Sequence, residues 1–280
     1  MGFIAIAGCG ALGGAVAHKL AGRDRVAEVR LIDPEGRIAQ GKALDILQAS
    51  PVEQFTTRIT SADTWAAAAG ADVVVVADDG SSASEHAGEA GLTILRQLVK
   101  FAGTAPIVFA GAGQRELMAR ASVELKVPRG RVLGSAPLAL ESAVRALAGV
   151  LLDTSGVDVA VRIVGVPPHA AVVAWEEATA SALPLSSQLR AHEIAALTSK
   201  IRSLWPPGPY ALASAASRVV EGLLGRSRRR FSCFVPLERG PLRDVVIAMP
   251  VELGPEGVRR VLEPSLTRQE QTLLENAIEM

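Results

Sequence analysis

The sequence predicts an α/β protein whose N-terminal part is a doubly wound parallel sheet and whose C-terminal part is a second α/β domain. Short apolar runs alternate with amphipathic stretches over the first half, which is typical of buried parallel strands joined by helices. The chain has 280 residues, of which 49% are hydrophobic, enough for one large or two small domains. We expect a boundary near residue 136, giving domains over 1–136 and 137–280.

The expected elements follow from these patterns in chain order. The strands of the first domain are predicted at Phe3–Ala7, Val29–Ile32, Val73–Ala77, Ile107–Ala110 and Val132–Leu133, with helices at Gly41–Gln48, Ser61–Ala69 and Gly91–Ala102. In the second domain we expect helices at 138–152, 186–204, 211–224 and 267–278, and strands at 157–164, 172–177, 231–235 and 245–251. Thr267 and Glu270 have the spacing of a capping box at the start of the last helix.

A glycine pattern follows the first strand. Gly8, Gly10 and Gly13 form a G-x-G-x-x-G turn before an apolar helix that begins near Leu12. The first glycine permits the tight turn, the second lets the backbone approach a pyrophosphate, and the third lets helix and strand pack closely. The N-terminus of the helix presents unpaired N–H groups to phosphates. The pattern predicts a dinucleotide site formed by the backbone of Gly8, Gly10, Ala11, Leu12 and Gly13.

Asp33 ends the second strand, 20 positions beyond the last glycine. A carboxylate at this place can accept a hydrogen bond from a ribose 2′-hydroxyl and would repel a 2′-phosphate. Asp33-Pro34-Glu35-Gly36 is also well suited to a type I turn. The two roles are compatible, and Asp33 is therefore a predicted cofactor ligand.

The charge balance gives no sign of a nucleic-acid or membrane partner, because Lys plus Arg and Asp plus Glu both number 29. The basic run Arg226–Arg230 is expected in a solvated loop and not on a nucleic-acid surface. Cys9 and Cys233 are too few for a disulfide framework and lack the spacing of metal ligands. The first apolar run is too short for an export signal and has no basic segment before it, so we expect a cytoplasmic protein.

Ten stretches, in order along the chain, resemble the malate/lactate dehydrogenase family. They are the glycine turn, Leu31–Asp33, Gly41–Asp45, Ser50–Val52, Ala71–Val76, Arg131–Gly134, Ser155–Val159, Pro209–Ala213, Met249–Val258 and Leu266–Glu270. The resemblance implies an NAD-binding Rossmann domain, with Ala77 and Asp78 beside the cofactor, followed by an α/β substrate domain. It also implies a homodimer or homotetramer.

The reaction implied by the resemblance transfers a hydride between nicotinamide and a 2-hydroxy or 2-oxo acid. Such a reaction needs a general acid and base, normally a His held by an Asp, because a hydroxyl proton leaves with the hydride. An Arg grips the substrate carboxylate in a bidentate fork. The family also uses Arg on a mobile loop and an Asn that contacts cofactor and substrate.

The arginines of this loop and the Asn are missing from this chain. No Lys or Arg lies between Arg58 and Arg96, so the segment 78–87 has no loop cation. Asp78 and Asp79 stand there instead; they could bind a ribose hydroxyl or a cation, or be solvated turn residues, which is the interpretation we favour. Gln114 follows the strand after which the family has Asn.

The other catalytic positions also differ. Glu141 takes the family's acidic position, but Val144 stands where the carboxylate-binding Arg belongs, and Arg145 is about 100° further around the helix. Glu141 and Arg145 are thus either an i,i+4 surface pair, which we favour, or part of a rearranged substrate site. The position of the catalytic His holds Pro167, and His169 two residues later is the candidate replacement.

Two hypotheses follow. In the first, an NAD-dependent oxidoreductase acts on the CH–OH group of a 2-hydroxy acid or related compound through His169, Glu141 and Arg145, with Asp78, Asp79 and His86 as further polar lining. A cleft without Arg would suit a neutral or cationic hydroxy compound. In the second, slightly favoured, the chain is a non-catalytic dinucleotide-binding or structural subunit, a pseudoenzyme. A positioned base contributes roughly 10²–10⁴-fold, so ordinary malate or lactate turnover is not expected. No metal site and no identified substrate follow from the sequence.

Overall fold

The computed structural model describes residues 2–82, 84–225, 229–237 and 245–279. Six strands form the parallel part of the main sheet: β1 (Phe3–Ala7), β2 (Glu28–Ile32), β3 (Arg58–Ala62), β4 (Val73–Val76), β5 (Ile107–Phe109) and β6 (Val132–Gly134). Antiparallel strands extend it: β8 (Ile163–Val166), β9 (Ala170–Val173), β12 (Arg230–Leu237), β13 (Val245–Gly254) and β14 (Gly257–Val261). The order is β3-β2-β1-β4-β5-β6-β12-β13-β8-β9, with β14 on β13. The predicted doubly wound α/β class is confirmed.

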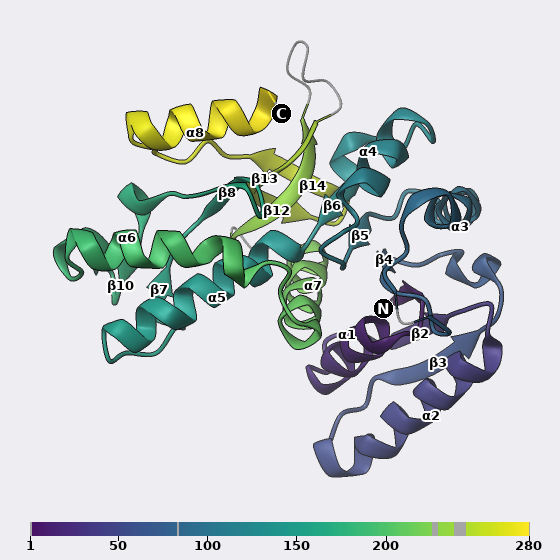
Figure 1. The fold of residues 1–280 in the computed structure, drawn as a ribbon. Coiled ribbons are helices and arrows are strands. Elements are labelled where there is room, and N and C mark those ends of the chain that lie inside the picture. The colour runs from purple at the N-terminus through teal and green to yellow at the C-terminus, as the bar shows by residue number, and fades with distance from the viewer. Residues whose placement is uncertain (1, 83, 226–228, 238–244, 280) are drawn as a thin grey trace.

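Eight α-helices pack on these strands in the part of the chain that is described. They are α1 (Ala11–Gly22), α2 (Gly36–Glu53), α3 (Gly88–Phe101), α4 (Arg115–Val123), α5 (Ala136–Leu151), α6 (Ala191–Lys200), α7 (Pro209–Leu224) and α8 (Arg268–Glu279). Figure 1 shows the N-terminal and C-terminal elements on opposite sides, with α7 between α1 and α5, both of which it contacts. A small second sheet joins β7 (Val159–Ala160), β10 (Thr179–Ala180) and β11 (Leu183–Pro184).

The core of the first part consists of strands buried on both faces. Residues of β1 and β4 such as Ile4, Ile6 and Val75 are fully buried, because helices cover both sides of the sheet. The sheet continues past residue 136 through β6 and β12, where Gly134 pairs with Phe234. Helix α5 begins at Ala136, and the division into two domains at this residue stays a prediction.

Several predicted elements differ from the structure. The segment predicted as a helix over Ser61–Ala69 instead ends β3 and continues into a 3₁₀ turn at Trp65–Ala68, because residues 58–62 pair with β2. The strand predicted over 157–164 is divided between two sheets, β7 and β8. The predicted strand 172–177 ends at Val173, and the predicted helix 186–204 is α6 followed by a 3₁₀ turn.

The start of the last helix agrees with the sequence prediction, whereas the basic run does so only in part, because Arg230 already belongs to β12. Thr267 N donates to Glu270 Oε2 at 2.8 Å and Glu270 N to Thr267 Oγ1 at 3.2 Å, which confirms the capping box of α8. Of the basic run, Arg226–Arg228 lie outside the described residues, while Arg229 and Arg230 are exposed. Among the helices of the described residues, none has the length and apolar character needed to cross a membrane.

Candidate functional site at the β1–α1 junction

The glycine turn lies at the carboxyl ends of two neighbouring parallel strands. Ala7 of β1 pairs with Val76 of β4, so Gly8 and Asp78 leave the sheet side by side. In doubly wound sheets, ligands bind at this edge, where the helices begin. The sequence-predicted cofactor residues Gly8–Gly13, Asp33, Ala77 and Asp78 are brought together here.

The three glycines have the structural roles that the pattern predicts. Gly8 has a φ of +98°, a backbone conformation that favours glycine. A Cβ on Gly13 would collide with the carbonyl oxygen of Gly8, so only glycine permits this packing of α1 on β1. A Cβ on Gly10 would collide with the Asp78 carboxylate. The group that the second glycine admits in this structure is therefore a side chain of the same protein.

Asp78 binds the N-terminus of α1. Its Oδ2 accepts a hydrogen bond from Leu12 N and its Oδ1 one from Gly13 N, both at 2.8 Å. Its carbonyl oxygen also accepts one from Gly10 N at 3.2 Å. Asp78 is only 3% exposed. Our expectation that Asp78 is a solvated turn residue is wrong, because the amides and positive end of the helix stabilise its carboxylate in a buried position.

The Asp33 carboxylate likewise accepts hydrogen bonds from backbone N–H groups. Its Oδ2 accepts from Cys9 N at 2.9 Å and from Gly80 N at 3.1 Å, and its Oδ1 accepts from Glu35 N at 3.0 Å. The carboxylate is buried. Asp33 thus joins the glycine turn, its own turn before α2 and the segment after β4.

Cys9 within the turn and Ala77 beside it complete this junction. The Cys9 side chain is buried, and burial, followed by the nearby Asp33 and Asp78 carboxylates, raises the pKa of its thiol to about 12. Ala77 N donates to Ala7 O at 2.9 Å, and Ala77 O accepts from Gln114 Nε2 at 2.8 Å. Neither side chain offers a charged or reactive group at neutral pH.

The segment after β4 also covers the turn after β5. Glu85 Oε1 and Oε2 accept from Ala112 N at 2.8 Å and Gly113 N at 2.7 Å. Gln114, fully buried, accepts from Gly111 N at 2.9 Å through Oε1 and donates through Nε2 to Ala77 O. Its amide is committed to holding loops together, which leaves it no free group for a substrate.

His86 and Asp79 have contrasting surroundings. The His86 side chain is buried, and its Nε2 has no hydrogen-bond partner among the described residues. Burial lowers the pKa of His86, although Asp79, Asp33 and Asp78 oppose that shift. Asp79 accepts from Ser81 and Ser82, and these hydrogen bonds lower its pKa to about 2. Asp79 is thus a turn residue, as expected.

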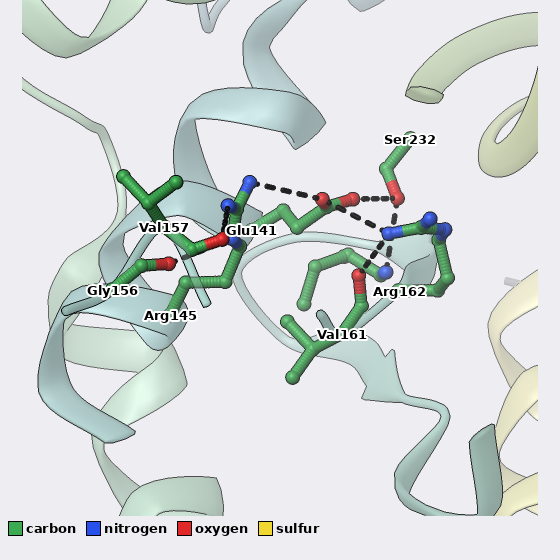
Figure 2. Close-up of polar contacts among 8 residues, drawn as sticks. Glu141, Arg145, Gly156, Val157, Val161, Arg162 and Ser232 are labelled. Carbon is green, nitrogen blue, oxygen red and sulfur yellow. Dashed lines mark hydrogen bonds and ion pairs between the residues drawn. The ribbon is translucent and has the colours of Figure 1, made fainter. Parts of the chain in front are cut away.

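A second polar cluster surrounds Glu141 on α5 (Figure 2). Its Oε1 accepts from Arg162 Nη1 at 3.2 Å, and its Oε2 accepts from Ser232 Oγ at 2.7 Å. Ser232 Oγ in turn accepts from Ile163 N at 3.1 Å. Glu141 is 2% exposed, and burial raises its pKa against the opposing effect of Arg162, Ser232 and Arg145.

Arg145 lies on the other side of Glu141, with 3.9 Å between Arg145 Nη1 and Glu141 Oε1. Its Nε and Nη2 donate to the carbonyl oxygens of Gly156 and Val157 at 3.3 and 3.2 Å. The prediction that Glu141 and Arg145 form a surface pair is therefore wrong, because Glu141 is buried. Its carboxylate tolerates burial because Arg162 and Ser232 donate hydrogen bonds to it.

His169 stands apart from this cluster. It lies in the turn between β8 and β9, and its side chain is exposed, with no hydrogen bond or ion pair to any described residue. The structure thus brings together Glu141 and Arg145 but gives His169 no partner. The described residues also contain no group of three or more His, Cys, Asp or Glu that could hold a metal ion.

The sequence interpretation missed Arg162, Ser232 and Glu85. A signal for Arg162 was present, because a charge inside an otherwise apolar run must find a partner when the run is buried. Ser232 and Glu85 carried no such signal, since their partners are 91 and 27 residues away.

These features define an α/β protein whose glycine turn lies at the edge where doubly wound sheets bind dinucleotides. Residues 3–97 match the family model described as lactate/malate dehydrogenase, NAD binding domain. Over 298 residues the chain is 28% identical to a malate dehydrogenase of Roseiflexus sp. (strain RS-1), covering 99% of this chain and 95% of the relative. The malate dehydrogenase of Thermomicrobium roseum is 26% identical over 289 residues, covering 97% and 93%.

Solved structures agree in fold. The malate dehydrogenase from Salinibacter ruber matches with a TM-score of 0.87 at 24% identity, covering 99% of this chain and 94% of the other. The lactate dehydrogenase from Cryptosporidium parvum, complexed with lactic acid and nicotinamide adenine dinucleotide, matches with a TM-score of 0.88 at 22% identity and the same coverage. Residues 3–97 are therefore similar to the NAD-binding domain of lactate/malate dehydrogenases, and almost the whole chain is similar in sequence to malate dehydrogenases.

The hydrogen bonds of the turn show how far this conformation fits NAD. The Leu12 and Gly13 N–H groups, which face the place of a pyrophosphate, already bind Asp78. The Asp33 carboxylate, which would face a ribose, already binds three backbone N–H groups. The residues therefore do not fit the dinucleotide as they are placed here, although the glycine turn itself has the required backbone.

Proposed function

We propose that this protein keeps the dehydrogenase fold without ordinary malate or lactate dehydrogenase activity, as a non-catalytic member of its family. The observation that carries the proposal is the internal pairing of Glu141. Its two oxygens are bound by Arg162 and Ser232, and its pKa is raised by burial. Held in this way, the group cannot orient a base or a substrate.

The position of His169 supports the same conclusion. An effective general base must be oriented by a partner and must lie within hydrogen-bond reach of the substrate. His169 is exposed in the β8–β9 turn and has no partner among the described residues. Without a positioned base, the family's reaction loses roughly 10²–10⁴-fold in rate. Loss of the carboxylate fork adds to this deficit.

Turnover assays with NADH and oxaloacetate or pyruvate, and with NAD and malate or lactate, test the proposal. We expect rates at the level of the buffer control for all four pairs. Turnover that rises in proportion to protein concentration and is abolished by His169→Ala would contradict the proposal. His192→Ala, which removes another exposed His on α6, is the matched control.

The second candidate is an NAD-dependent oxidoreductase with a rearranged site and a neutral or cationic hydroxy substrate. Similarity to malate and lactate dehydrogenases supports it, as does the absence of Lys and Arg between Arg58 and Arg96, where those enzymes carry loop arginines. A screen of sugar alcohols and amino alcohols separates the two candidates. Saturable turnover of one such compound, with none of malate or lactate, would favour the oxidoreductase.

The proposed assembly is a homodimer, in keeping with the family. Tyr210 on α7 is 84% exposed. Together with residues of α1 and with Ile46 and Ala49 of α2, it lines one cavity of about 720 Å³. This mixed apolar and polar face would bury the Tyr210 side chain against a second copy. Size-exclusion chromatography with light scattering measures the assembly, and Tyr210→Asp should shift a dimer toward the monomer.

A further inference from the structure

Of the six N–H groups of residues 8–13, five donate hydrogen bonds within the chain. Gly8 N donates to Ile32 O at 2.8 Å and Gly10 N to Asp78 O at 3.2 Å. Cys9 N donates to Asp33, and Leu12 N and Gly13 N donate to Asp78. Among these groups, Leu12 N and Gly13 N belong to the helix N-terminus, where a pyrophosphate binds. An incoming anion would therefore have to break existing hydrogen bonds.

The carboxylate of Asp78 resembles a phosphate in the features that this turn recognises. It carries negative charge, it presents two oxygens, and it accepts from two consecutive N–H groups of the first helical turn. A Cβ on Gly10 would collide with this carboxylate. The closest approach that glycine permits at this position is thus made by Asp78.

His86 gives an independent sign that this junction is built for polar groups. It is 5% exposed, and its Nε2 lacks a partner among the described residues. A Cβ on Gly8 would lie 2.7 Å from that nitrogen, so the unpaired atom faces the glycine turn. A polar ligand at the turn would supply the partner that is missing.

We propose that the Asp78 carboxylate is an intramolecular ligand of the pyrophosphate-binding amides, and that a dinucleotide enters the turn only by displacing it. The Gly80 N–Asp33 hydrogen bond holds the same segment over the turn. Displacement then also breaks the hydrogen bond from Gly80 N to Asp33, whose carboxylate keeps those from Cys9 N and Glu35 N. The proposal does not depend on whether the protein is catalytic, because it concerns binding alone.

Isothermal titration with NADH and, separately, with inorganic pyrophosphate tests this proposal. A hydrogen bond to a charged group changes an equilibrium by about tenfold or more, and two such bonds compete here. We expect weak or undetectable binding to the wild type at millimolar ligand and at least tenfold tighter binding of both ligands to Asp78→Ala. Pyrophosphate needs only the helix N-terminus, so its affinity should increase even if Asp33 stays bound to Gly80.

Asp79→Ala is the matched control, because it removes an equal charge from the adjacent residue, whose carboxylate binds Ser81 and Ser82 and not α1. Its affinities should equal those of the wild type. If Asp78→Ala does not fold, as judged by circular dichroism, Asp78→Asn provides the comparison. Micromolar binding of NADH by the wild type, or a folded Asp78 variant without tighter binding of either ligand, would overturn the proposal. Turnover by the wild type would contradict the proposed non-catalytic function but would not contradict the proposal that Asp78 binds the amides.

Discussion

Replacement of Arg162 by Met should destabilise the protein by leaving the buried Glu141 carboxylate without its nearest cation. The two side chains are 22% and 2% exposed and lie 3.2 Å apart. Removal of one partner from a buried ion pair costs about 3–5 kcal/mol. We expect the lower end, about 3 kcal/mol, because Ser232 still donates and Arg145 stays 3.9 Å away.

The loss should depend on pH in a defined direction. Burial raises the pKa of Glu141, and removal of Arg162 takes away the largest opposing effect. A carboxyl whose pKa is raised by folding contributes stability below its unfolded pKa of about 4.3, and loses it as pH rises through the folded value. Arg162→Met should therefore be less damaging at pH 5 than at pH 7.

Urea unfolding followed by circular dichroism measures both effects. Arg230→Met, an exposed Arg on β12, is the control and should change stability by less than about 0.5 kcal/mol. In the double variant Glu141→Gln/Arg162→Met, the total loss should fall short of the sum of the single losses by about 1–2 kcal/mol. A loss below about 0.5 kcal/mol for Arg162→Met, or strict additivity in the double variant, would refute the inferred pairing.

Three further predictions concern the glycine turn and its surroundings. Gly13→Ala should lower the free energy of unfolding by about 1–3 kcal/mol, because the new Cβ would collide with the Gly8 carbonyl oxygen. Gly41→Ala in α2 is the control: its Cβ would have no atom within 4 Å, and it should raise the free energy of unfolding by about 0.5–1 kcal/mol. Equal effects of the two variants in thermal unfolding would refute the close packing at Gly13. Burial lowers the pKa of His86, so the stability it contributes is present above its unfolded pKa of about 6.5 and is lost as pH falls. His86→Leu should accordingly flatten the fall in stability between pH 7 and pH 5, and an unchanged slope would count against a buried neutral imidazole. The Cys9 thiol, whose pKa is raised to about 12, should react with iodoacetamide at pH 8 only on unfolding; rapid labelling of the native protein would show that the turn is open.

The fold of the first part could be predicted from the sequence because its strands are buried on both faces and are thus continuous apolar runs. The glycine turn was predictable for a similar reason, since the positive φ of Gly8 and the close approach at Gly13 restrict these positions to glycine. Strand β3 was missed because, of its five residues, only Ile59 is buried, which leaves little hydrophobic pattern.

The side-chain contacts within the two polar clusters could not be predicted from the sequence in the same way. Asp78 was placed correctly at the carboxyl edge, but the sequence does not show whether a carboxylate there faces water or turns toward a helix terminus. Glu141 and Ser232 are 91 residues apart, and only the packing of α5 against β12 brings them together. The i,i+4 spacing in the sequence indicated a pair between Glu141 and Arg145. In the folded protein Arg162, from a distant part of the chain, lies nearer to Glu141 than Arg145 does.

Backbone hydrogen exchange at Leu12 and Gly13, measured by NMR on the ligand-free protein, tests the central claim most directly. With Asp78 bound to both N–H groups, their exchange should be slowed to a degree comparable with Val16 and Ala17 inside α1, and millimolar NADH should add little protection. Exchange of Leu12 and Gly13 at the rate of an unstructured chain, slowed only when NADH is added, would show instead that the amides are open and await the cofactor.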